Sequence, residues 1–177
     1  MAWSTPLTAV SGSVLTAAQW NTSVRDNLNE TAPAKATAAG QIFVSTGANA
    51  IAARLPNADF VGTQETTTST TYTDLATTGP TVTATTAASA IVATYCNQFH
   101  STGLAAWMSY TISGATSDPA DDNRSLQLQS TGGQHIGGTF FHSSILTPGT
   151  NTFTAKYRVS TSGTGTFSSR RLLVIPL

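Results

Sequence analysis

The sequence predicts a mainly β protein, in which an N-terminal extended tether with one short helix precedes a C-terminal antiparallel β-sandwich that is jelly-roll-like. Three observations predict this class. From residue 60 onward, runs of alternating apolar and polar residues follow one another, as expected for half-buried strands. Turn sequences rich in Gly, Pro and Ser separate these runs at short intervals, which is typical of sandwiches. A helical pattern occurs in residues 16–30 alone.

The composition sets the size and the surface chemistry of the protein. The 177 residues suffice for one moderate domain and an appendage. Charged residues make up 9% of the chain, against about 25% in typical soluble domains, so hydroxyls and amides must form most of the polar surface. Eight basic and eight acidic residues cancel, and we expect neither nucleic acid nor a membrane as a partner. Such a surface suits a subunit of an assembly, and a secreted β protein is the alternative.

The helix expected at residues 16–30 carries its own start and stop signals. Thr16 is a suitable N-cap, and Gln19 stands three residues later, which completes the capping-box pattern. Pro33 disfavours continuation, so we expect the helix to end near Glu30.

One apolar stripe runs along this helix. Trp20, Val24 and Leu28 recur every fourth residue, and Leu15 ahead of the helix is placed to contact Trp20. A helix of about four turns is marginal in water by itself, so the stripe must pack on the protein's own β domain, on symmetry mates or on a separate partner. The sequence does not choose among these three. Together with Trp3, these four residues are the expected attachment or oligomer interface.

The chain divides into three parts by its patterning. Residues 1–40 form the N-terminal attachment segment, with the helix and a linker of small residues after it. Residues 41–59 predict a short hairpin or connector, with a turn at 47–49. Residues 60–177 predict the β-sandwich, built from about eight strands.

The strand patterns also predict the core of the sandwich. The run at 150–160 alternates most regularly, and the run at 172–175 has no polar residue, which predicts burial on both of its faces. Trp107 lies within a strand pattern, where packing in the core is the default, and the lone Cys96 is expected to be a buried thiol. The expected buried residues include Val82, Ile91, Met108, Ile112, Leu126, Phe153, Tyr157, Val174 and Ile175.

Few residues in the sequence suggest a catalytic or metal-binding site. Residues 117–124 gather Asp118, Asp121, Asp122 and Asn123, whose oxygens resemble calcium ligands, but the order of an EF-hand loop is missing and a solvated turn is the better interpretation.

The three histidines also lack the setting of a metal site. His135 falls in a Gly-rich turn and His142 in a strand, and together with His100 they lack a further zinc ligand suggested by the sequence. The sequence contains no nucleophile elbow, phosphate loop or HExxH motif. We therefore expect no metal, no cofactor and no enzymatic activity.

The N-terminal motifs resemble those of a known group of proteins. "MAWSTPLTAVSGSVLTAAQWNTSVRDNLN" resembles the start of many structural proteins of tailed phages, particularly phages of actinobacteria. "GQIFVSTGANAIAARL" is similar to a segment of phage tail and fibre proteins, and "LTPGTNTFTAKYRVSTSGTGTFSSRRLLVIPL" resembles the β-sandwich that ends such chains. These stretches, with "YTDLATTGPTVTATTAASAIV", cover most of the chain.

The resemblance implies a minor structural protein on the surface of a virion: a tail or neck fibre, a head fibre, or a capsid decoration protein. It implies a trimer, attachment to other virion proteins (capsid, neck or tail) through the N-terminal segment, and no catalytic residues. The alternative function is a receptor- or carbohydrate-binding head, in which Trp3, Tyr95, Trp107 or Tyr110 would stack on a host-surface glycan.

Overall fold

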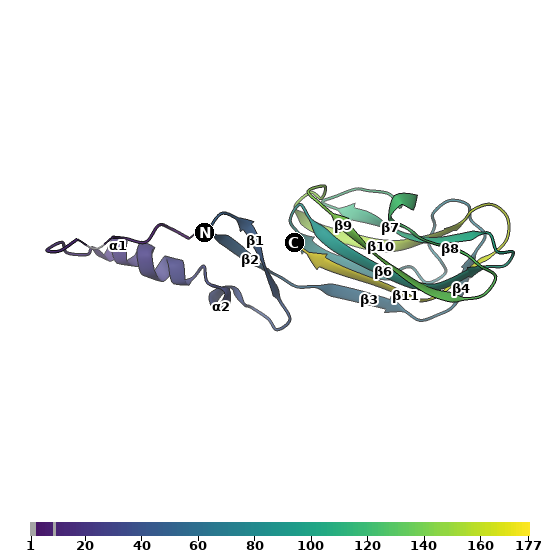
Figure 1. Cartoon of the computed structure of the whole chain (residues 1–177), viewed down its shortest axis with the longest axis horizontal. Helices are drawn as coiled ribbons and strands as arrows, with labels where there is room; N and C mark the ends of the chain where they lie inside the picture. Colours follow the sequence, from purple (N-terminus) through teal and green to yellow (C-terminus); the bar gives the residue numbers. More distant parts are fainter. Residues whose placement is uncertain (1–2, 9) are drawn as a thin grey trace. The chain divides into compact units, whose positions relative to one another are not determined.

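A computed structural model describes residues 3–8 and 10–177, in two compact units that meet between Leu55 and Pro56. The first unit holds the α- and π-helical residues and a hairpin, and the second holds the sandwich (Figure 1). Within the described residues, no helix has the length and apolarity needed to cross a bilayer.

The helix of the first unit is capped as expected but is not α-helical throughout. Thr16 and Gln19 form the capping box, and α1 spans Ala17–Trp20. It continues into the π-helical η1, Asn21–Asp26, and the helical backbone stops after Leu28. The residues after it do not form the expected linker from end to end, because α2 occupies Ala32–Lys35. Pro33 lies in the first turn of α2, where its fixed φ and missing N–H do no harm.

A two-stranded hairpin completes the first unit. Strand β1, Ile42–Gly47, pairs antiparallel with β2, Ala50–Arg54. Asn49 adopts a positive φ of 55° in the turn between them, a conformation that Asn tolerates better than most residues. In the described part of this unit, the buried side chains are polar: Asn27 and Glu30.

The second unit is a sandwich of two antiparallel sheets. One sheet has the order β5-β10-β7-β8, and the other has the order β3-β11-β6-β9, with β4 also paired to β11. Neighbouring strands are mostly distant in sequence, and the chain crosses repeatedly between the sheets, as in a jelly roll. The expected fold class is therefore confirmed. The strands are β3 (Asn57–Val61), β4 (Glu65–Thr67), β5 (Thr81–Thr86), β6 (Ala90–His100), β7 (Ala105–Gly114), β8 (Leu126–Gln129), β9 (Gln134–His142), β10 (Gly149–Val159) and β11 (Gly165–Pro176), with a 3-10 turn η2 at Asp122–Arg124. The expected start of the sandwich, residue 60, falls inside β3.

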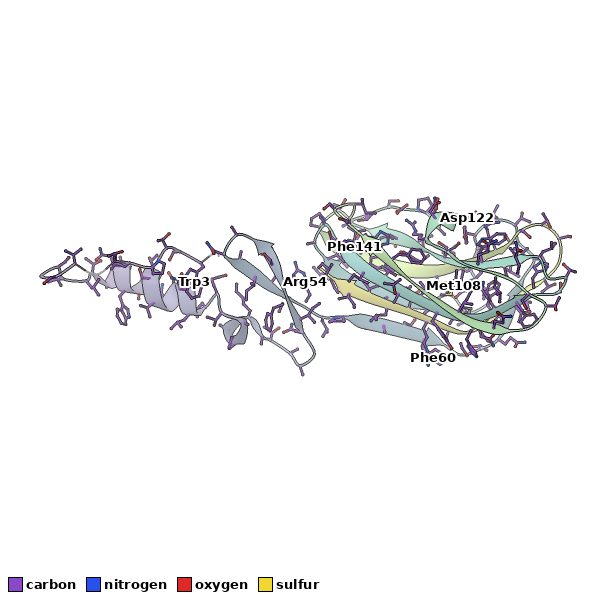
Figure 2. The ribbon with its side chains drawn as sticks, viewed as in Figure 1. Trp3, Arg54, Phe60, Met108, Asp122 and Phe141 are labelled. Carbon is purple, nitrogen blue, oxygen red and sulfur yellow. The ribbon has the colours of Figure 1, made fainter. Side chains whose placement is uncertain are left out.

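The core lies between the two sheets, and most of its predicted members are there. Figure 2 shows one of them, Met108, within the sandwich. The predictions confirmed by burial are Val82, Met108, Ile112, Leu126, Phe153, Tyr157 and Val174. Two predictions are wrong, because Ile91 and Ile175 lie on the outer face and are half-buried. Their neighbours Val92 and Val174 point inward instead.

A β-bulge in β11 explains why Ile175 points outward and Val174 points inward. Ser168 pairs with Asn97 and Arg171 pairs with Tyr95, so that two β11 residues oppose Cys96 alone. The bulge shifts the inward phase of the strand by one residue. Arg170, Leu172 and Val174 consequently point inward. The expectation that residues 172–175 are buried on both faces is wrong, since the outward side chains are half-buried.

Candidate functional site

The extended N-terminal segment is held against the helix by one side chain. Asn27 accepts hydrogen bonds from the Ser4 N–H (2.8 Å) and hydroxyl (3.0 Å), and its amide donates to the Ser4 carbonyl (3.2 Å). The same amide donates to the Ser23 carbonyl at 3.1 Å. At the hairpin, the Trp3 N–H donates to the Asn49 carbonyl at 2.6 Å. The segment, the helix and the hairpin are thus joined by polar contacts.

The five predicted attachment residues lie mostly on the surface. Trp3, Leu15, Trp20 and Leu28 are 40%, 47%, 56% and 58% exposed, and Val24 is half-buried. Three of them come together, because Leu15, Trp20 and Val24 line a hollow of about 240 Å³.

The other two predicted residues lie outside this hollow. Pro6 and Leu7 of the extended segment close it, whereas Leu28 is not part of its lining. Trp3 lines a different hollow, next to the hairpin turn.

Asn27 was not among the predicted site residues, although the sequence carries a signal for it. Asn is unfavourable inside a helix because its amide competes for backbone hydrogen bonds. Asn21 and Asn29 share this signal, so it marks the asparagines of the helical pattern as a group and does not single out Asn27. The contact that Asn27 makes is with the backbone of Ser4.

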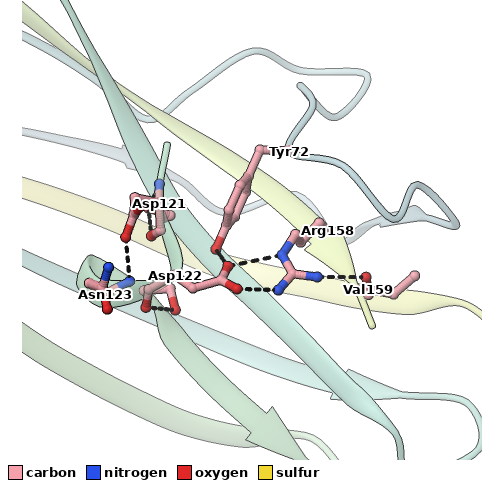
Figure 3. A network of polar contacts seen from close by, with 8 residues as sticks. Tyr72, Asp121, Asp122, Asn123, Arg158 and Val159 are labelled. Atoms are coloured by element: carbon pink, nitrogen blue, oxygen red, sulfur yellow. Dashed lines mark hydrogen bonds and ion pairs between the residues drawn. The ribbon is translucent and has the colours of Figure 1, made fainter. Parts of the chain in front are cut away.

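Two aspartates of the acidic loop, Asp118 and Asp122, pair with arginines. Asp122 accepts two hydrogen bonds from Arg158 (3.1 and 2.6 Å) and one from the Tyr72 hydroxyl (2.8 Å), as Figure 3 shows. The hydrogen bonds from Arg158 hold the pKa of Asp122 below its usual range. Burial, and then the bond to Asp122, raise the pKa of Tyr72 to about 12. The Arg158 guanidinium also stacks on Trp107, 3.8 Å from the ring centroid.

The position of Trp107 under Arg158 differs from the expected packing in the core. Trp107 does not pack in the core but lies half-buried on the outer face of β7, under Arg158.

In the acidic loop, Asp118 forms an ion pair with Arg124, and Asp121 accepts a hydrogen bond from the Asn123 N–H at 2.6 Å. The loop therefore binds its own chain, and no group of His, Cys, Asp and Glu suited to a metal occurs among the described residues.

His142 and His135 each share a hydrogen bond with a tyrosine of the sandwich. His142 is buried, with its Nε2 at 2.6 Å from the Tyr110 hydroxyl, and burial lowers its pKa. His135 lies in β9 and not in a turn, and its Nδ1 is 2.7 Å from the Tyr95 hydroxyl. Its ring stacks on Tyr95, with the centroids 5.5 Å apart.

A groove of about 520 Å³ crosses the outer face of the five-stranded sheet. Its apolar lining includes Ala58 of β3, Leu173 of β11 and Ala93 of β6. Phe60, Arg171 and Tyr95 lie side by side on the same three strands and also line it. Phe60 is 49% exposed, and Figure 2 labels it beside β3.

A buried ion pair lies below the bulge of β11. The Arg170 guanidinium is fully buried and contacts Glu65 at 3.0 Å. Glu65 also accepts hydrogen bonds from the Thr77 N–H (3.0 Å) and hydroxyl (2.6 Å). Burial opposes the charge of Glu65, but the Thr77 bonds and the Arg170 charge outweigh it and lower its pKa. This pair joins β4 to β11 and is structural.

No family model and no curated protein matches the chain. Among solved structures, a chain of infectious bursal disease virus, Gx strain, is 13% identical with a TM-score of 0.40, over 75% of this chain and 36% of that chain's length. A family 16 carbohydrate-binding module is 9% identical with a TM-score of 0.32, over 75% of this chain and 84% of that one. At these identities and TM-scores, neither likeness is a basis for a function.

Proposed function

We propose that the protein is a non-enzymatic structural subunit on the surface of a phage virion, attached through its N-terminal unit and displaying the β-sandwich. The observation that carries the proposal is the absence of an apolar core in the first unit. In residues 3–8 and 10–55, no apolar side chain is buried, whereas Leu15, Trp20 and Leu28 are about half exposed. A unit that buries so little apolar surface gains little stability by itself.

Docking on a partner supplies the missing burial. Full burial of side chains such as Trp20, Val24 and Leu28 contributes roughly 1.5–3 kcal/mol each. The hollow lined by Leu15, Trp20 and Val24 offers a partner a concave apolar surface. The partners that fit this surface are other virion proteins of the capsid, neck or tail, in line with the sequence resemblance.

A second partner for the same surface is the protein itself. Three copies around one axis would bring their exposed helical side chains together and form a stalk. We therefore propose a homotrimer, which sedimentation equilibrium of the full chain tests. A monomer at all concentrations would restrict the apolar surface to contacts with other virion proteins.

Deletion of residues 1–30 tests the attachment. We expect the deleted protein to keep the circular dichroism of the β-sandwich but to be lost from particles assembled in its presence. The full chain, added in parallel, is the control. Undiminished incorporation of the deleted protein would refute the proposal.

A second candidate function is the binding of a saccharide by the sandwich. The observation that favours it is the groove with Phe60, Arg171 and Tyr95 on the outer sheet face. A binding head attaches to host cells as a soluble protein, whereas a decoration protein binds emptied capsids and raises their resistance to heat. Comparison of the two binding assays with the same protein separates these functions.

A further inference from the structure

Arg171 differs from every other basic side chain of the sandwich. In residues 56–177, all of which the structure describes, the other lysine and arginines each contact a carboxylate. These pairs are Lys156 with Asp74, Arg124 with Asp118, Arg158 with Asp122, and Arg170 with Glu65. Arg171 contacts none in this range. Because the net charge of the chain is zero, an unpaired guanidinium on a sheet face is an unusual local charge.

The guanidinium is held in place without using its hydrogen-bond donors. It lies over the Phe60 ring, 4.2 Å from the centroid, in the row that also contains Tyr95. No hydrogen bond from this guanidinium to residues 56–177 is present. Its five N–H donors form a planar fork that matches a carboxylate with two parallel hydrogen bonds.

The rest of the groove lining is mostly apolar, with two polar residues, Asp59 and Thr94. The Asp59 carboxylate accepts hydrogen bonds from the N–H groups of Thr81 (2.7 Å) and Phe60 (2.8 Å). Ala58, Leu173 and Ala93 form the next row on the same three strands, and the two small alanines leave room beside the row of Phe60, Arg171 and Tyr95. The ring of Tyr95 is held by His135, which both stacks on it and shares a hydrogen bond of 2.7 Å. A volume of about 520 Å³ lies within the usual range of ligand sites, roughly 300–1,000 Å³.

We propose that this groove binds a saccharide that carries a carboxylate, such as a uronic acid. The carboxylate pairs with Arg171, and the C–H face of the sugar ring lies against Tyr95 and Leu173. This inference rests on the second candidate function and names its site and ligand class.

The backbone around the groove favours a saccharide over an extended acidic peptide. A peptide strand binds by hydrogen bonds to a free sheet edge. β3 is the edge strand of this sheet, but the groove lies across β3, β11 and β6, whose facing backbone groups are already paired with one another. It therefore offers ring faces and a guanidinium, which are contacts that an acidic sugar uses.

Calorimetric titration of the full chain with a panel of acidic oligosaccharides tests the proposal. The panel contains trigalacturonate and trimannuronate, and each has its methyl ester as a neutral control. We expect the acids to bind more tightly than the esters, and Arg171→Gln to weaken the acids roughly ten- to a hundredfold, since a charge-assisted hydrogen bond is lost. Phe141→Leu is the matched control, because Phe141 is exposed on the same sheet face but does not line the groove.

The outcomes separate the inference from the function on which it rests. Acid-selective binding that Arg171→Gln weakens and Phe141→Leu does not would support the inference, as would amide shifts of Ala93 on titration. Equal binding of acids and esters would overturn it and leave the second candidate function standing. A complete lack of saccharide binding would overturn both. Binding of penta-glutamate as tight as that of the acidic sugars would also overturn it, because charge alone would then suffice.

Discussion

The side-chain amide of Asn27 bonds to both backbone groups of Ser4, accepting from its N–H at 2.8 Å and donating to its carbonyl at 3.2 Å. One side chain thus gives the extended segment the two hydrogen bonds that a neighbouring strand would give. Asn27→Ala removes both and leaves partly buried backbone groups without partners. We expect a loss of about 1–2 kcal/mol in the free energy that holds the segment on the helix, measured as faster hydrogen exchange of the Ser4 amide.

Asn29→Ala is the control for this experiment. Asn29 is an exposed residue at the end of the same helix and takes no part in the contacts to Ser4. If both variants speed the exchange of Ser4 equally, the change reflects fraying of the helix and not the loss of the Asn27 contact.

The Glu65–Arg170 pair gives a second prediction, on the stability of the sandwich. Glu65→Gln keeps the shape of the side chain but leaves the fully buried Arg170 without its counter-charge. We expect the free energy of unfolding in urea to fall by about 3 kcal/mol. Asp74→Asn, which breaks the more exposed pair with Lys156, should cost less than about 1 kcal/mol. Equal effects of the two variants would contradict a special role for burial.

Because the pKa of the Glu65 carboxylate is lowered, we expect the stability of the protein to depend on pH. The pKa of Glu65 in the folded protein is lower than the ordinary value of 4.5, so its contribution to stability is complete above that pH and is lost as the pH falls through the folded value. We therefore expect the wild-type protein to lose more stability between pH 6 and pH 3 than Glu65→Gln does, by urea unfolding at each pH. Parallel curves for the two proteins would show that Glu65 does not contribute.

Cys96 should be chemically silent while the protein is folded. Its side chain is fully buried, and burial raises the pKa of the thiol to about 12, which removes the reactive thiolate at neutral pH. We expect a disulfide reagent at pH 8 to modify it in urea but not in buffer, with rates followed by absorbance. Rapid modification of the native protein would mean that β6 and β11 open locally around the bulge.

Much of the sandwich could be predicted because its strands alternate clearly. Phe153 and Tyr157 lie in a regular run, and both are buried as expected. The β6 run could not be assigned a face in this way. Ala90 and Val92 point inward and the larger Ile91 points outward, because the outer face of this sheet is itself apolar, so hydrophobicity does not distinguish the two sides.

The bulge and the groove depend on contacts that the sequence does not display. Strict alternation from Phe167 would turn Arg171 inward, and only the extra residue at Ser169–Arg170 turns it outward. Arg171 then meets Phe60, which is more than a hundred residues earlier in the chain. The site thus follows from sheet pairing, and no local motif marks it.

Replacement of the exposed helical side chains distinguishes docking of the helix on a partner from packing of these side chains within their own chain. Trp20 and Leu28 are 56% and 58% exposed, so replacing both with Ser removes little packing within the chain, and we expect the thermal midpoint of the isolated protein to stay unchanged. In the double variant, the free energy of a docking that buries these side chains should weaken by roughly 1.5–3 kcal/mol per side chain. Incorporation into particles should therefore fall at least tenfold, measured by quantitative blotting. Val14→Ser, at an exposed apolar residue outside the predicted set, should change neither quantity. A lower thermal midpoint with normal incorporation would show that these side chains pack within their own chain, and the attachment role would then be wrong.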